Sequence, residues 1–319
     1  MFVLDRSRTR YAAQYGPALA DHLPMTLVAL ASMGASKRRL SEYARSYLEN
    51  KGLRALESDD REWTARAALR DRIESQGRAS VIAAELSVAG AGIGAGAFHA
   101  LIRVAYGIAE GDDDEIAAGL TYWRDASLDL GAPTIARETK LLDVVSALGR
   151  IRTLLADVAD RIGDRGHIAT QMELVAGDAF FDVACGHPLF GESPLVDIAA
   201  AAVRAFAATQ NFRLLHVMTA THAMRMVLPF AREPDELMQY FWRALVAAYV
   251  SAGAPPIPSE DVWRHEIDRT ADWAVLHARA CASEDEHVIK ATYTAWSEDN
   301  VYHDPLYRIA AQRYLDRTL

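Results

Sequence analysis

The helix-start signals spread along this chain are the feature that most constrains its fold. Asp112 stands three residues before Glu115, and Ser283 stands three before Glu286, which is the spacing of a capping box. Three prolines stand where a first helical turn tolerates them: Pro194, Pro234 and Pro305. The sequence between these signals is rich in Ala and Leu, and alternating β-branched runs are scarce. An all-α chain with roughly thirteen to fifteen helices is therefore predicted.

Four segments repeat one layout, in which a histidine precedes an apolar helix, a polar turn and a second helix. The leading residues are His22, His99, His222 and His287. Their unequal spacing excludes a regular solenoid. Four such hairpins suit a large helical bundle around a central metal site and cavity. Any all-helical protein made of hairpins also produces such a pattern, so a helical scaffold with structural histidines is the alternative.

Length and charge limit the classes of protein. The 319 residues fit one all-helical domain over residues 1–319, with an irregular lid or linker expected at residues 163–193. The net charge of −9, without a block of Lys and Arg, argues against nucleic acid or an anionic membrane as partner. No apolar run reaches the length of a bilayer span, and the N-terminus has no apolar signal segment. Two widely separated cysteines favour a reduced, cytoplasmic protein, and the sequence does not predict its oligomeric state.

The stretch "GAGIGAGAFHALIRVAYGI" at residues 90–108 has the glycine spacing of a dinucleotide fingerprint at Gly92, Gly94 and Ala97. That fingerprint needs a strand before it, whereas the preceding "SVIAAELSVAGA" looks helical. Glycine also permits close backbone approach and unusual dihedral angles. We therefore expect a break that places His99 at the first turn of a buried helix, or a tight crossing of two helices.

Five of the ten histidines stand in apolar surroundings: His22, His99, His216, His222 and His287. A buried imidazole costs free energy unless both nitrogens have partners, and neutral imidazole is the commonest protein ligand of transition metals. His216 and His222 lie about 120° apart on a straight helix, so both reach one ion only where the helix is locally unwound. His287 and Lys290 share a helix face.

Several segments resemble the questin oxidase-like proteins, a family with fungal members that open the rings of anthraquinone-type polyketides and with bacterial homologues. The matching pieces are "DHLPMTLVALASMGAS", "GAFHALIRVAYGI" with "EIAAGLTYW", "LLHVMTATHAMRMVLP" and "EDEHVIKATYTAW". They span residues 21–297, and the match is poor over residues 150–205.

The resemblance implies a non-haem iron(II) oxygenase whose iron is held by four histidines and by a lysine carboxylated with CO2. Lys290 in "HVIK" resembles that lysine, and His22 and His99 resemble ligands. Three histidines compete for two further places: His216, His222 and His287. The motifs and the hairpin pattern favour His222 and His287. A carbamate brings one negative charge to neutral imidazoles, and burial near a cation lowers the pKa of lysine, so that it becomes neutral and takes up CO2.

Three side chains are candidates for holding the phenolate or quinone oxygens of a small aromatic substrate: Arg103, Tyr106 and Arg225. Each shares a helix face with His99 or His222, and ordinary salt bridges are the alternative for the arginines. The expected reaction is O2-dependent oxidation or opening of a ring of an aromatic polyketide. One alternative is an NADPH-dependent Baeyer–Villiger-type monooxygenase, for which the chain carries no nucleotide motif. The others are a carboxylated-lysine hydrolase with a pair of zinc or nickel ions, and the helical scaffold with structural histidines.

Overall fold

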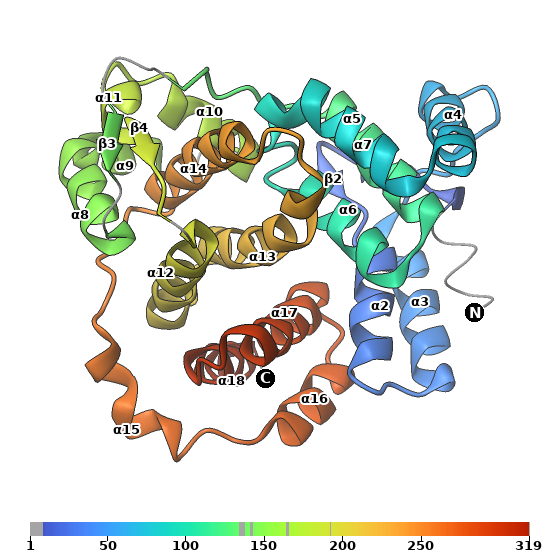
Figure 1. Ribbon diagram of the computed structural model, residues 1–319. Coiled ribbons are helices and arrows are strands. Elements are labelled where there is room, and N and C mark those ends of the chain that lie inside the picture. The colour runs from blue at the N-terminus through green and yellow to red at the C-terminus, as the bar shows by residue number, and fades with distance from the viewer. Residues whose placement is uncertain (1–8, 134–137, 141–142, 164–165, 192, 319) are drawn as a thin grey trace.

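The computed structural model describes residues 9–133, 138–140, 143–163, 166–191 and 193–318, and it confirms an all-α fold (Figure 1). Seventeen α-helices are found among these residues, more than predicted because several are very short. The strands form two separate two-stranded sheets, one antiparallel and one parallel. They are β1 (Gln14–Tyr15) with β2 (Leu19–Ala20) and β3 (Glu138–Lys140) with β4 (His187–Leu189). None of the described helices combines the length and the apolar character needed to cross a bilayer.

The N-terminal helices build one end of the molecule, drawn in blue to green in Figure 1. Helices α2 with α3 and α6 with α7 are the hairpins predicted after His22 and His99, and α6 packs closely on α7. The elements are α2 (Leu23–Ser32), α3 (Lys37–Lys51), α4 (Arg61–Gln76), α5 (Arg78–Ala89), the 3-10 turn η1 (Gly90–Gly92), α6 (His99–Glu110) and α7 (Asp113–Asp125).

The opposite end contains the stretch 163–193 that the sequence predicted to be irregular. That prediction was wrong for its secondary structure, because two helices and β4 occupy most of it. The helices were missed because segments of nine and five residues are too short to show a hydrophobic period. Gln171, Met172 and Val175 are buried, and α10 packs on α14. The helices are α8 (Val144–Leu154), α9 (Ala156–Ile162), α10 (Ile168–Ala176) and α11 (Phe181–Cys185).

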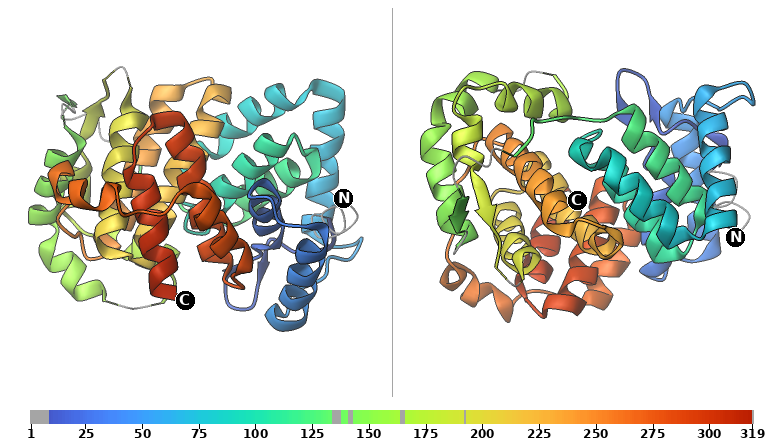
Figure 2. Two further views of the ribbon diagram at one scale, coloured as in Figure 1. Left: turned by 90° about the horizontal axis from the view of Figure 1, so that it is seen from below. Right: turned by 45° about the horizontal axis from the view of Figure 1, so that its top comes forward.

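The C-terminal half supplies the middle of the molecule, as the two views of Figure 2 show. Helix α13 packs against α6, α12, α14 and α17, and α17 packs against α2 and α18. Twelve of the sixteen residues of α13 are buried, so this helix presents side chains to the interior on more than one face. The elements are α12 (Pro194–Thr209), α13 (Phe212–Val227), η2 (Leu228–Phe230), α14 (Pro234–Ser251), η3 (Glu260–Trp263), α15 (Arg264–Ile267), α16 (Trp273–Ala282), α17 (Glu286–Tyr302) and α18 (Leu306–Thr318).

The helix starts follow the sequence signals with one correction. Asp112 caps α7 by accepting a hydrogen bond from the backbone of Glu115, as predicted. The predicted capping box of Ser283 with Glu286 is not formed. Asp285 is the capping residue of α17 instead, and its carboxylate accepts from the backbone N–H of His287. An aspartate directly before the helix meets the first free N–H groups better than a serine two residues further away.

The glycine-rich stretch follows helix α5 and not a strand, so the dinucleotide fingerprint lacks its structural context. Gly96 has φ +54°, and a side chain there would collide with the Tyr122 hydroxyl. Ala97 and Phe98 also have positive φ, at 57° and 70°. This left-handed run turns the chain sharply, so that His99 becomes the first residue of α6, as the sequence predicted.

Substitution of Gly119 in α7 tests the close crossing of α6 and α7. A Cβ added there would lie 2.8 Å from the backbone nitrogen of Val104 in α6. We expect Gly119→Ala to lower the free energy of unfolding by about 1–3 kcal/mol, because the two backbones must separate. Gly149→Ala in α8 is the matched control, since its added Cβ meets nothing within 4 Å. The control substitution should raise the free energy of unfolding by about 0.5–1 kcal/mol. Urea unfolding compares the two, and equal effects would contradict the close crossing.

Candidate metal centre

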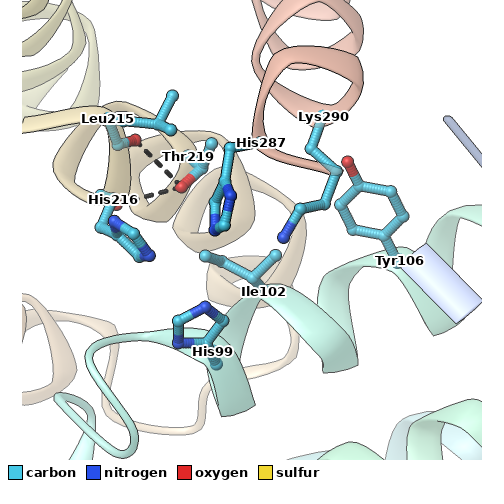
Figure 3. A pocket seen from close by; sticks show the side chains of 8 residues that line it. All are labelled: His99, Ile102, Tyr106, Leu215, His216, Thr219, His287 and Lys290. Atoms are coloured by element: carbon cyan, nitrogen blue, oxygen red, sulfur yellow. Dashed lines mark hydrogen bonds between the residues drawn. The ribbon is translucent and has the colours of Figure 1, made fainter. Parts of the chain in front are cut away.

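Four imidazoles and one lysine meet where α2, α6, α13 and α17 pack together. Three of the histidines stand at helix starts: His22 is the residue before α2, His99 begins α6, and His287 is the second residue of α17. His216 lies one turn into α13. Figure 3 shows His99, His216, His287 and Lys290 directed toward one space.

The imidazole rings form a closed circuit of short contacts. Ring centroids are 4.7 Å apart for His22 and His99, 4.8 Å for His22 and His287, 4.9 Å for His99 and His216, and 6.0 Å for His216 and His287. Lys290 Nζ lies 3.0 Å from His22 Nδ1. Residues that are 268 positions apart in the chain are therefore in direct contact.

Three of the four imidazoles are oriented through Nδ1. The pairs are His99 Nδ1 with Gly96 O at 2.5 Å, His216 Nδ1 with Phe212 O at 2.8 Å, and His287 Nδ1 with Asp285 Oδ1 at 3.2 Å. An oxygen acceptor places the proton on Nδ1 and leaves the lone pair on Nε2. The Nε2 atom of His99 is buried without a hydrogen-bond partner among the described residues. This arrangement is the one that orients histidine for binding a metal ion.

The electrostatic surroundings keep the imidazoles uncharged. Burial, together with the charge of Lys290 nearby, lowers the pKa of His22 and of His99 well below the ordinary range. Burial lowers the pKa of His216 to about 3. The pKa of Lys290 falls to about 8 through burial, against the opposite effect of Glu286 and Asp285. Near neutral pH the imidazoles therefore carry free lone pairs, which a metal ion requires.

The space between these side chains is a cavity of about 10 Å³. It holds little more than one water-sized ligand. Four polar residues of the cluster and four others line it: His99, His216, His287, Lys290, Ile102, Tyr106, Leu215 and Thr219. Burial raises the pKa of Tyr106 well above its ordinary value, so its phenol stays neutral and can donate a hydrogen bond into the cavity.

The structure brings His216 and not His222 to the cluster. Helix α13 is a regular α-helix throughout, without the local unwinding that would let both histidines reach one point. His222 instead contacts Glu298 of α17, with Nδ1 2.6 Å from Oε1. Arg225 Nη2 donates to the same carboxylate oxygen at 2.6 Å.

The two arginines named from the sequence are held by carboxylates. Arg103 forms a buried ion pair with Glu115 across the contact of α6 and α7, with Nε 2.9 Å from Oε1. Arg225 pairs with Glu298. Neither arginine lines the cavity, whereas Tyr106 does.

Two neighbours of the cluster were not identified from the sequence. A carboxylate oxygen of Glu286 lies within 4.8 Å of ligand atoms of His22 and His287, but Lys51 Nζ also holds this carboxylate at 2.8 Å. The ring of Phe212 contacts the rings of His216 and His287, with centroids 4.7 Å apart in both cases. The spacing of four residues between Phe212 and His216 is the signal that indicates this contact.

The fold and the cluster define an all-helical protein with a buried centre of four imidazoles and one lysine. Residues 193–295 match the sequence profile of a family described as questin oxidase-like. Over this range the match supports the resemblance that the sequence segments indicated. His216, His287 and Lys290 lie inside the matched range, and His22 and His99 lie outside it. No protein of curated function matches the chain.

The buried Glu298 gives a pH-dependent prediction. Burial raises the pKa of Glu298, but its contacts with His222 and Arg225 outweigh this and hold the pKa below the ordinary value of 4.5. A carboxyl with a depressed folded-state pKa stabilises above its unfolded pKa and loses that contribution as the pH falls. We expect Glu298→Gln to lower the free energy of unfolding by roughly 1–3 kcal/mol near pH 7, and by less below about pH 4.

Urea unfolding at both pH values checks this expectation. Glu42→Gln is the control, because Glu42 pairs with Arg38 on the surface and should have little effect at either pH. If Glu298→Gln lowers the free energy of unfolding by the same amount at both pH values, the ionised carboxylate does not stabilise the fold.

Proposed function

We propose that this chain is an iron(II)-dependent oxygenase that uses O2 to oxidise or open a ring of an aromatic polyketide. The observation that carries the proposal is the convergence of four neutral imidazoles and Lys290 in one buried cluster. Three of these imidazoles and Lys290 line its cavity. The questin oxidase-like match supports an oxidoreductase acting on such compounds.

The side chains fit a resident metal ion. His22, His99, His216 and His287 would hold it, and the oxygen partners of three Nδ1 atoms keep those rings in orientation. A donor set of four imidazoles favours a borderline transition ion over calcium or magnesium. Iron(II), when bound, supplies a centre that brings O2 and an electron-rich ring into redox contact.

Lys290 would supply the missing negative charge. The neutral imidazoles leave the charge of a divalent ion uncompensated, and the N-termini of α2, α6 and α17 add positive potential at the same place. With a pKa of about 8, roughly a tenth of the Lys290 side chains are neutral near pH 7. The Nζ lone pair then forms a bond to the carbon of CO2, one proton leaves to solvent, and a carbamate with charge −1 results.

The rest of the lining would orient the reactants. The neutral phenol of Tyr106 donates a hydrogen bond to an oxygen anion of the substrate. Ile102 and Leu215 exclude water from the cavity. Arg103 and Arg225 are already engaged by Glu115 and Glu298, so in this proposal they position α6 and α13 and do not contact the substrate.

Two histidines of α13 give a paired test of the metal ligands. His216→Ala should lower iron affinity by at least about tenfold, since even groups outside the ligand set are worth that much. His222→Ala should keep its iron while losing thermal stability, because it breaks contacts with Glu298 and Tyr293 and none with the cluster. Iron per chain is measured by elemental analysis after purification with ferrous iron. Iron loss in His222→Ala, with His216→Ala fully loaded, would reverse the assignment.

The modified lysine is tested with ¹³C-labelled bicarbonate. Wild type should show one carbamate carbon resonance, and Lys290→Ala should lose both this resonance and most of the iron. Added formate or acetate should restore part of the iron by supplying a carboxylate in the vacated space. Lys37→Ala, at an exposed position, is the control and should change neither quantity. Full iron loading of Lys290→Ala without added carboxylate would contradict the role of Lys290.

The reaction itself is tested with a dihydroxyanthraquinone and the iron-loaded protein. We expect O2 uptake matched to loss of the anthraquinone without NADPH, and ring-opened or hydroxylated product by mass spectrometry. Uptake only with NADPH would indicate the monooxygenase. A pair of zinc or nickel ions without O2 uptake would indicate the hydrolase, and a metal-free, inactive protein would leave the helical scaffold.

A further inference from the structure

Phe212 contacts the histidine cluster and also lines a surface groove. Its ring contacts His216 and His287 edge to face, at interplanar angles of 76° and 73°. The same residue lines a surface groove of about 630 Å³ formed by the loop before α10, the link between α12 and α13, and the end of α18. The groove and the histidine cavity share no lining residue. Phe212 lines the groove, and its ring contacts His216 and His287, which line the cavity.

The ring of Phe212 is well placed to move. Phe212 is 46 % exposed, although it packs against two imidazoles. It is the first residue of α13, and its side chain can rotate toward the groove while the backbone stays in place. The carbonyl of Phe212 would continue to accept from His216 Nδ1 during that rotation, so the orientation of His216 does not depend on the Phe212 ring.

The volumes show why this movement matters. The histidine cavity of about 10 Å³ cannot accept an aromatic ring, whereas the groove of about 630 Å³ can accept a molecule of three fused rings. Rotation of Phe212 would open a ring-sized space against His216 and His287. A substrate ring entering that space would replace the aromatic contacts that Phe212 gives up, so the exchange has a small net cost.

The charge of the groove indicates the kind of molecule that it receives. The chain has a net charge of −9, yet the groove-lining residues that the structure describes include His167, Arg213 and Arg317 and no carboxylate. Arg317 Nη1 donates to the backbone oxygen of Gln210 at 2.6 Å, and its guanidinium has no carboxylate partner among the described residues. Gln171 and Asn211 add neutral polar groups to the lining.

We propose that this groove binds a planar aromatic anion and that the Phe212 ring is the movable partition between the groove and the histidine cavity. The inference rests on the proposed function, because it names the route by which a polyketide phenolate reaches the cluster. It adds Phe212 as the residue that controls access and Arg317 as a residue that holds the anion in the groove.

Chemical labelling tests the partition independently of iron. The full chain, freed of metal by a chelator, is treated with diethyl pyrocarbonate, and modification of each histidine is followed by peptide mass spectrometry. Phe212→Ala should raise the labelling rates of His216 and His287 several-fold and leave exposed His265 unchanged. Phe212→Leu should give a smaller increase, because leucine still covers the two rings. Phe180→Ala removes a 60 % exposed ring elsewhere and is the matched control.

Unchanged labelling of His216 and His287 in Phe212→Ala, with a far-ultraviolet circular dichroism spectrum like that of wild type, would overturn the partition. A general rise that includes other buried histidines, such as His22, would indicate loosened folding. In that case Phe212→Leu decides, because selective labelling of His216 and His287 supports the partition and uniform labelling overturns it.

Binding of 1,8-dihydroxyanthraquinone to the same metal-free chain tests the groove. The probe should protect His216 and His287 from labelling in wild type. Arg317→Ala should weaken its binding by roughly two- to fivefold, the size expected for an exposed charge pair. Arg264→Ala removes an exposed arginine paired with Asp261 and should leave binding of the probe unchanged. Protection that is insensitive to Arg317→Ala, or absent, would overturn the groove as the binding site. Failure of the proposed function would instead appear as missing iron or missing carbamate, which these measurements do not involve.

Discussion

The burial of four uncharged imidazoles beside a lysine is the constraint on which the site depends. Such a group of nitrogens is expensive to bury unless something binds their lone pairs. Glu286, which lies beside the cluster, is engaged by Lys51, and three helices have their positive ends at the same place. Cation and helix termini repel each other there, so a bound metal needs an anionic ligand. In the proposed reaction, the same potential would favour a substrate in its phenolate form.

Helix α13 joins two buried polar sites. One face presents His216 and Thr219 to the cavity, while another presents His222 to Glu298. The sites are electrically different, because the first gathers neutral nitrogens and the second pairs an ionised carboxylate with Arg225. The second tethers α13 to α17, which carries His287 and Lys290. A polar contact outside the cluster thus keeps two of its helices in register.

The sequence predicted the helical class, the hairpins led by His22, His99 and His287, and the role of the glycine stretch in starting α6 at His99, because each depends on local patterns. It could not choose between His216 and His222. Both stand in apolar surroundings, and only the packing of α17 decides which one meets Glu298. The contacts of Phe212 and Glu286 depend on residues far along the chain, so local patterns carry little of their signal. The short helices between 163 and 193 fell below the length at which periodicity is detectable.

The contact between His22 and Lys290 encloses nearly the whole polypeptide. In the proposed centre, an ion or a carbamate would link these two residues. Closing so long a loop reduces the conformational entropy of the unfolded chain more than a local link does. In the proposed oxygenase, the metal centre is completed only when α17 packs on α2 and α13, so a chain truncated before α17 could not assemble it. Chemistry with oxygen would thereby be confined to molecules that have finished folding.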